Sequence, residues 1–189
     1  MVISKPHAIH FTGSITQQTA HMLNNAFLEA LGQNATEIKF LFSSEGGDLN
    51  AGLSFYNFLR AYPLPISVYN FASVESIAVL IYLAAGRRYI LPGTSFLLHG
   101  FHASFPVATV ANAQLVERGE SLQYYADVYA DIFNERTKGA QSPVKINDAL
   151  RGKGIRISDL AAISAGIAMF KVEPGGLIVN TDAHWRVSP

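Results

Sequence analysis

Residues 66–85 read ISVYNFASVESIAVLIYLAA. The first part, Ile66–Phe71, is rich in β-branched and aromatic residues, which is the composition of a buried strand. The last part, Ile77–Ala85, is apolar on every side of a helix, so that helix is expected to be buried and to end at Gly86. A short polar turn that contains Ser76 joins the two. A buried strand that leads directly into a buried helix is a basic unit of an α/β fold.

The same alternation of strands and helices continues along the chain. Strands are predicted at Ala8–Thr12, Glu37–Ser43, Ile66–Phe71, Tyr89–Leu91, Phe96–His99 and Ile167–Lys171. Helices are predicted from a capping box at Ser14 and Gln17 to Gly32, over Asn50–Arg60, Ile77–Ala85, Val110–Thr137 and Asp159–Ala165, and in a short segment after Pro143. Strands separated by helices indicate βαβ units and a mainly parallel sheet.

The organisation of the chain predicts one folded unit. We find no linker, low-complexity stretch or internal repeat, so residues 1–189 are expected to form a single domain. Residues 172–189 contain a Pro-Gly-Gly turn followed by an apolar run, Leu177–Val179. This C-terminal extension is expected to add a hairpin or a strand, and to serve as an interface arm.

Composition limits the classes of partner. Apolar residues make up 49% of the 189 residues and charged residues 15%, which predicts a partly apolar surface and hence subunit interfaces. There are 14 basic and 14 acidic residues, giving a formal net charge of zero. Nucleic acids and anionic membranes attract a positive field, so neither is expected as a partner.

Cysteine is absent from the sequence. This excludes disulfides, thiolate metal sites and a cysteine nucleophile. The longest apolar run, Ile77–Ala85, is far shorter than the roughly 20 residues of a membrane helix, and Met1–His10 has no signal-peptide pattern. We therefore expect a cytoplasmic protein. His99 and His102 lack an accompanying carboxylate cluster, so no metal and no cofactor are expected.

Three segments carry candidate chemistry. Ser43–Asp48 reads SSEGGD, and its glycines can present free N–H groups to an oxyanion, or simply form a tight turn. Ser76 lies where a strand turns into a helix, the position of an activated nucleophile, but also that of an N-cap. His99 ends the last apolar strand, where a histidine can be a base or a packing residue.

The order and spacing of these segments resemble the proteolytic subunit of the Clp protease, a member of the crotonase superfamily. The matching pieces are the glycine loop with its Ala-Gly helix start at Ser43–Gly52, the strand-to-serine segment Ile66–Ser76, the helix end Leu83–Gly86, the hairpin pieces Leu91-Pro92 and Leu97–His99, and a weaker match at Ser158–Gly166. The resemblance covers most of the chain. It implies an α/β spiral of βαβ units with a projecting long helix.

The resemblance also implies a serine peptide hydrolase that works through an acyl-enzyme. Ser76 matches the nucleophile and His99 the general base, and the backbone N–H groups of Gly47 and Ile77 match the oxyanion hole. The implied substrate is a peptide or an unfolded protein.

The chain departs from the family pattern at several positions. Glu45 replaces a proline of the glycine loop, and Glu75 replaces a small apolar residue before the serine. Gly154 falls where the family has its triad aspartate, so Asp148, Asp159 and Glu75 are the candidates for the third member. The segment that forms the axial entrance of Clp rings is also missing, which argues against docking to an unfoldase ATPase.

Two other functions stay open. A crotonase-fold enzyme acting on acyl-thioesters would share the oxyanion hole but would use carboxylates in place of Ser76 and His99. A catalytically inactive, ring-forming relative would keep the architecture after loss of the triad. The helix at Val110–Thr137 resembles the handle by which Clp rings stack, which predicts a homo-oligomeric ring. Its apolar stripe comprises Leu115, Leu122, Tyr125, Tyr129, Ile132 and Phe133.

Overall fold

A computed structural model describes residues 5–102, 111–175, 177 and 183–187. The strands are β1 Pro6–Thr12, β2 Glu37–Ser44, β3 Ile66–Glu75, β4 Arg87–Ile90, β5 Ser95–Leu98, β6 Ile155–Ser158, β7 Phe170–Lys171 and β8 Ala183–Val187. The helices are α1 Gln17–Gly32, α2 Leu49–Ala61, α3 Ala78–Ala84, α4 Asn112–Arg136, α5 Ile146–Arg151 and α6 Asp159–Ala162. Val110 and Ile178-Val179, which the sequence assigned to a helix and to the C-terminal extension, lie outside the described residues.

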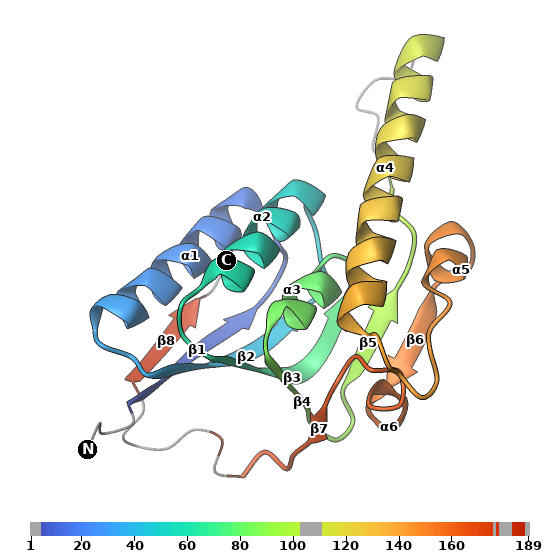
Figure 1. The fold of residues 1–189 in the computed structure, drawn as a ribbon. Helices are drawn as coiled ribbons and strands as arrows, with labels where there is room; N and C mark the ends of the chain where they lie inside the picture. The colour runs from blue at the N-terminus through green and yellow to red at the C-terminus, as the bar shows by residue number, and fades with distance from the viewer. Residues whose placement is uncertain (1–4, 103–110, 176, 178–182, 188–189) are drawn as a thin grey trace.

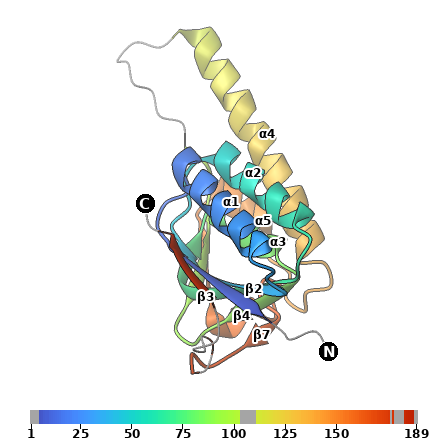
Figure 2. The same cartoon turned by 90° about the vertical axis from the view of Figure 1, so that its left-hand side faces the viewer.

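One mixed sheet organises the molecule. Its main path runs β6-β5-β3-β2-β1-β8; off this path, β4 pairs with β3, and β7 pairs with β4. Every strand pair is parallel except β5 with β6. Helices α1, α2 and α3 cover one face of the sheet (Figures 1 and 2). The predicted α/β fold with a mainly parallel sheet is thus confirmed.

Strand β3 divides its pairing between two neighbours. Its first half, Ser67–Asn70, pairs with β4, and its last three residues, Ser73–Glu75, pair with β5. Strands β4 and β5 therefore do not form the hairpin that the sequence suggested, because both lie parallel to β3. Strand β6, which the sequence analysis did not identify, pairs antiparallel with β5.

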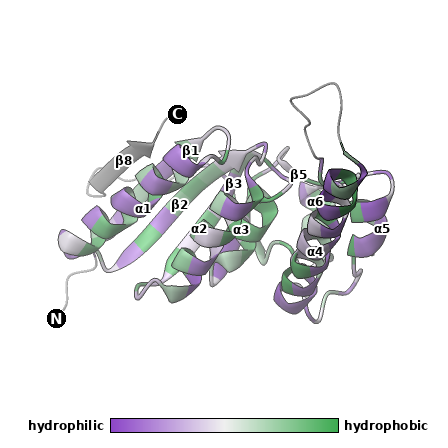
Figure 3. Ribbon diagram, turned by 90° about the horizontal axis from the view of Figure 1, so that it is seen from above, coloured by the Kyte–Doolittle hydropathy of each residue, from purple (hydrophilic) through white to green (hydrophobic). Residues whose placement is uncertain are grey.

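The core lies between the sheet and the helices. Phe27 of α1 makes edge-to-face contacts with Phe40 of β2, Phe55 of α2 and Tyr62 just after α2. Such aromatic pairs contribute about 0.5–1.5 kcal/mol beyond the area they bury. All seven residues of α3 are buried, as its unbroken apolar composition predicted. Along α1 and α4, by contrast, hydrophilic residues alternate with hydrophobic ones (Figure 3).

The start of α1 differs from the prediction. The N-cap is Thr16, whose side chain accepts the Thr19 N–H in a reciprocal capping box. The Ser14 hydroxyl instead donates to the Glu45 carboxylate. Two overlapping threonine and serine patterns precede this helix, and the three-residue spacing alone does not select between them.

The C-terminal extension contributes a strand, one of the two outcomes expected for it. Strand β8 pairs in parallel with β1, in the register His7 with Ala183. It therefore lengthens the sheet at the edge opposite β6.

Helix α4 extends away from the body of the molecule (Figure 1). Its second half is anchored, because Tyr129 and Phe133 are buried in the core. Its first half is exposed: Leu115 retains 49% and Val116 52% of their accessible surface. The predicted apolar stripe is therefore split between the core of this chain and solvent.

Two arginines attach α4 to the body. Arg88 of β4 is buried and donates to the backbone carbonyls of Arg136, Gly166 and Ile167. Burial lowers the pKa of Arg88 to about 10, so the guanidinium remains charged at neutral pH. Arg136 in turn donates to two carbonyls at the end of α3. The negative end of the helix dipole there also stabilises the positive charge of the guanidinium.

The Arg88→Met variant is expected to lose about 2–4 kcal/mol of unfolding free energy, because it leaves buried carbonyl groups without donors. Urea unfolding at one protein concentration measures this loss. Arg87→Met is the matched control. The Arg87 side chain is 56% exposed, and its ion pair with the Glu37 carboxylate is long, at 3.7 Å. It should change stability by less than about 0.5 kcal/mol. Equal losses in the two variants would contradict the anchoring role of Arg88.

Candidate active site

Ser76 lies in a strained turn directly after β3. Its φ is +54°, in the left-handed region that a residue with a side chain rarely adopts. Its hydroxyl does not cap α3, because the N-cap residue is Ile77 and no side chain caps that helix. The N-cap interpretation of the serine is therefore wrong. Backbone strain of this kind is concentrated at functional sites, and it resembles the turn that exposes the nucleophile in other hydrolases.

Strand register brings His99 beside Ser76. Strands β3 and β5 are parallel, with Glu75 opposite Leu97, and the Ser76 N–H donates to the Leu97 carbonyl at 2.8 Å. The two candidate residues therefore follow the carboxyl ends of neighbouring parallel strands, the edge at which α/β sheets bind ligands.

The His99 ring is fixed by a backbone carbonyl. Its Nδ1 lies 2.7 Å from the carbonyl oxygen of Gly100. Because a carbonyl can only accept, Nδ1 carries the proton, and Nε2 is the basic nitrogen of the neutral ring. A side chain at Gly100 would place its Cβ 2.4 Å from the Leu150 carbonyl oxygen. Close packing against the end of α5 therefore requires glycine at this position.

The glycine loop packs closely against the Ser76 side chain. A Cβ on Gly46 would lie 2.6 Å from the Ser76 Cβ, and a Cβ on Gly47 would lie 2.2 Å from the Ile15 carbonyl oxygen. Both glycines have positive φ, +93° and +146°. The loop is held by Ile15, which donates to the Gly46 carbonyl and accepts from the Asp48 N–H. Only glycine permits this close approach of the two backbones.

Two amide groups remain for a ligand. Within the described residues, the N–H groups of Gly47 and Ile77 donate to no backbone or side-chain acceptor. Ile77 packs tightly on α2, where a Cβ on Gly52 would lie 2.3 Å from the Ile77 Cγ1. This contact gives a physical reason for the Ala-Gly start of α2. Two free donors beside a hydroxyl form the arrangement that stabilises an oxyanion.

A hydrogen bond from helix α4 holds the turn at Ser76. The Tyr129 hydroxyl, which is fully buried, donates to the Ser76 carbonyl at 3.0 Å. Burial raises the pKa of Tyr129, so the phenol stays protonated and remains a donor. The Ser76 carbonyl also accepts the Val79 N–H at 3.0 Å. The helix that projects from the body thus also orients the strained residue.

Ser76, His99 and Gly47 line one cavity of about 230 Å³. It is lined by Glu45, Gly47, Leu49, Ser76, His99, Phe101 and His102. The rings of His99 and His102 lie 5.9 Å apart. No hydrogen bond joins the Ser76 hydroxyl to His99 among the described residues. The structure thus brings the predicted nucleophile, base and Gly47 to one cavity, without direct contact between hydroxyl and imidazole.

The candidate third members lie away from His99. Glu75 pairs with Arg156 at 3.2 Å and accepts from Ser73. Asp159 pairs with Lys171 at 3.0 Å, and the hydrogen bond from that lysine holds the pKa of Asp159 below its usual value. Asp148 is exposed on α5 and lines a different cavity, with Val144 and Ile155 among its neighbours.

Gly154 occupies the place beside the histidine. A Cβ on Gly154 would lie 2.9 Å from the His99 Cβ. Backbone therefore fills the space that a carboxylate side chain would need. In the part of the chain that the structure describes, no carboxylate contacts the His99 ring.

Sequence reasoning missed several residues of this site. Gly100, Phe101, Leu49 and Tyr129 became visible only through tertiary contacts. Gly100 gave one signal, since a glycine directly after a strand-end histidine permits close packing. Tyr129 was predicted only as part of the apolar stripe of the long helix, and nothing in the sequence linked it to Ser76, which lies 53 positions away.

Two kinds of site are not found in the described ranges. No group of three or more His, Cys, Asp or Glu residues there could hold a metal ion. No described helix is long and apolar enough to cross a bilayer.

The comparisons with known proteins agree on one protein family. The Clp protease family model matches residues 2–168. The ATP-dependent Clp protease proteolytic subunit 2 of Borreliella burgdorferi is 31% identical over 102 residues, covering 52% of this chain and 51% of that protein. Subunit 3 of Rhizobium meliloti is 29% identical over 97 residues, 50% of each chain. The matches thus span about half the length of these curated relatives.

A solved structure agrees with the fold. A mutant of ClpP1 from Listeria monocytogenes superposes with a TM-score of 0.76 over 91% of this chain and 95% of that chain. The sequence identity is 21%, so this likeness concerns the architecture.

Proposed function

The chain belongs to the Clp protease family, and on this premise we propose that it is a serine peptidase with Ser76 as nucleophile and His99 as general base. One observation carries the proposal: the strained Ser76, the half-buried His99 and Gly47 line the same cavity. The substrate would be a peptide or an unfolded polypeptide, the class on which a peptidase of this family acts.

The chemistry follows from the arrangement of the groups. Ser76 Oγ would attack the carbonyl carbon of the substrate while His99 Nε2 takes the hydroxyl proton. The carbonyl oxygen becomes an oxyanion and accepts from the Gly47 and Ile77 N–H groups. The C–N bond then breaks, and His99 returns the proton to the leaving amine. Water, activated by the same nitrogen, hydrolyses the acyl-enzyme.

A backbone carbonyl takes the part of the orienting acid in this proposal. The Gly100 carbonyl holds the Nδ1 proton at 2.7 Å and so fixes the tautomer that leaves Nε2 basic. A neutral carbonyl stabilises the imidazolium less than a carboxylate does. The enzyme is therefore expected to be slower than one with a complete triad. The hydroxyl and the imidazole must also come within hydrogen-bond reach when substrate binds, because free enzymes are often looser at this contact.

Labelling with a fluorophosphonate probe tests the proposal. Native protein should react at one site, which mass spectrometry should locate at Ser76, and heat-denatured protein should not react. The absence of labelling in folded, assembled protein would instead support a catalytically inactive relative. Labelling at any other serine would refute the assigned nucleophile.

We also propose that the chain forms a homo-oligomer, as a ring. The first half of α4 exposes Leu115, Val116 and Tyr124, the last with 65% of its surface accessible. A projecting helix with exposed apolar residues is suited to burial against a second copy of the chain.

Light scattering at micromolar concentration should give several times the 20.5 kDa mass of one chain. The Leu115→Glu variant should reduce that mass, because it places a charge in the proposed interface. Glu117→Gln, on the same exposed helix, is the control and should leave the mass unchanged. A monomeric wild-type protein would refute the proposed assembly.

A further inference from the structure

We infer that Glu45 makes the site selective for substrates that carry a basic residue at the scissile bond, on the acyl side. This inference rests on the proposed function and names the substrate class of that site. Its basis is an acidic residue, Glu45, that lines the cavity together with Ser76 and His99.

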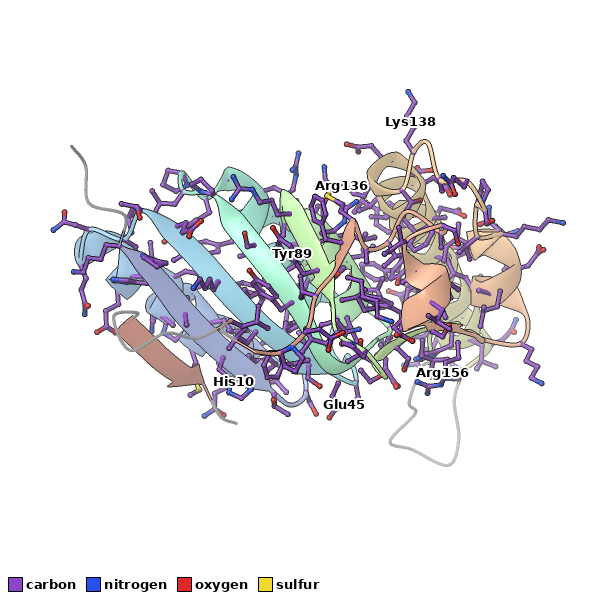
Figure 4. The ribbon with its side chains drawn as sticks, turned by 90° about the horizontal axis from the view of Figure 1, so that it is seen from below. His10, Glu45, Tyr89, Arg136, Lys138 and Arg156 are labelled. Carbon is purple, nitrogen blue, oxygen red and sulfur yellow. The ribbon has the colours of Figure 1, made fainter. Side chains whose placement is uncertain are left out.

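The backbone holds Glu45 close to the nucleophile. Gly46 packs directly on Ser76, with a Cβ-to-Cβ approach of 2.6 Å if a side chain were added. Because consecutive Cα atoms are about 3.8 Å apart, the Glu45 Cα lies no more than about 8 Å from the Ser76 Cβ. Glu45 lines the same small cavity. Figure 4 shows Glu45 at the edge of the molecule where Arg156 also lies.

One hydrogen bond holds the Glu45 side chain in place. The Ser14 hydroxyl donates to Oε1. The residue is exposed, and no cation of the described residues pairs with it. One carboxylate oxygen therefore remains for a ligand.

The neighbouring carboxylates are engaged elsewhere. Glu75 forms its ion pair with Arg156, and the Asp48 carboxylate accepts the Ala51 N–H at 2.7 Å as the N-cap of α2. Of the residues that line this cavity, Glu45 is the one acid within the described part of the chain. With both histidines neutral, the residues that line the cavity therefore carry one formal negative charge, that of Glu45.

A charge at this distance produces a measurable preference. Unit charges a few ångströms apart across a partly solvated wall change a rate or binding constant by roughly tenfold. An ammonium or guanidinium group on the acyl side gains this factor, and a carboxylate loses it. Salt should weaken the preference, because the Debye length falls to about 3 Å at 1 M.

The test uses acetyl-Ala-Ala-X-aminomethylcoumarin substrates in which X is Lys, Gln or Glu. For the wild type, kcat/KM should fall by roughly tenfold from Lys to Gln and again from Gln to Glu at low salt. Glu45→Gln should make the three rates equal within about twofold, and Glu45→Lys should invert the order. Glu29→Gln, a change of the same charge on the distant α1, should leave the wild-type order intact. Equal rates for Lys and Glu in the wild type, or an unchanged order in Glu45→Gln, would overturn the inference.

A binding measurement separates this inference from the proposed function. The corresponding acetyl-Ala-Ala-X-amides are titrated into Ser76→Ala, which needs no hydrolysis to give a result. Tighter binding of the Lys peptide by roughly tenfold over the Glu peptide supports the role of Glu45, even if the wild type hydrolyses nothing and the proposed function fails. Equal affinities, or no binding of any peptide, overturn the inference.

Discussion

Replacing Ser76 by alanine is expected to abolish fluorophosphonate labelling and to lower kcat for ester and peptide substrates by roughly 10⁴- to 10⁶-fold. The reason is that the substitution removes the atom that forms the acyl bond. Folding should be preserved, since alanine keeps the Cβ that contacts Gly46 and adopts the φ of +54° at the same cost as serine. Urea unfolding should therefore give a free energy within about 0.5 kcal/mol of the wild type.

Ser73→Ala is the matched control for this prediction. The Ser73 hydroxyl lies three positions earlier on β3 and donates to the Glu75 carboxylate at 2.7 Å, away from the cavity. Its removal should change kcat by less than about threefold. Persistent labelling of Ser76→Ala would show that another hydroxyl is the nucleophile. Similar losses in both variants would indicate a structural effect on the strand.

The fold could be predicted because the hydrophobic patterns along this chain are simple. Helix α3 is apolar throughout and is preceded by an apolar strand, so its burial followed from composition. The division of β3 between β4 and β5 could not be predicted, because both partners are only four residues long and neither pattern encodes register. Strand β6 was missed for a related reason: four residues, Ile155–Ser158, give too little alternation to recognise.

The candidate site was partly encoded in local sequence. The glycine loop and Ser76 each sit at a strand-to-helix turn, where short-range rules apply. Whether Ser76 caps a helix depended on its φ, which the sequence does not give. The orientation of His99 depended on Gly100, Leu150 and Gly154, which meet only after folding. The acidic partner sought in the sequence has the role that we propose for the backbone carbonyl of Gly100.

His99→Ala is expected to lower kcat by about as much as Ser76→Ala, roughly 10⁴- to 10⁶-fold, because a nucleophile and its base act as a unit. Without Nε2, the hydroxyl proton has no acceptor in the attack, and no group returns a proton to the leaving amine. The double variant should be no slower than either single variant. Pre-steady-state labelling with a fluorophosphonate, together with hydrolysis of an activated ester, measures both effects.

His102→Ala is the matched control, since both imidazoles line the cavity with ring centroids 5.9 Å apart. Of these two histidines, His99 is the one that a described backbone carbonyl contacts, at 2.7 Å from Nδ1, and His99 directly follows the strand that pairs with the end of β3. The His102 variant should therefore keep kcat within about tenfold of the wild type. A larger loss in His102→Ala than in His99→Ala would assign the base to His102. Additive losses in the Ser76 and His99 double variant would mean that the two residues do not act in the same step.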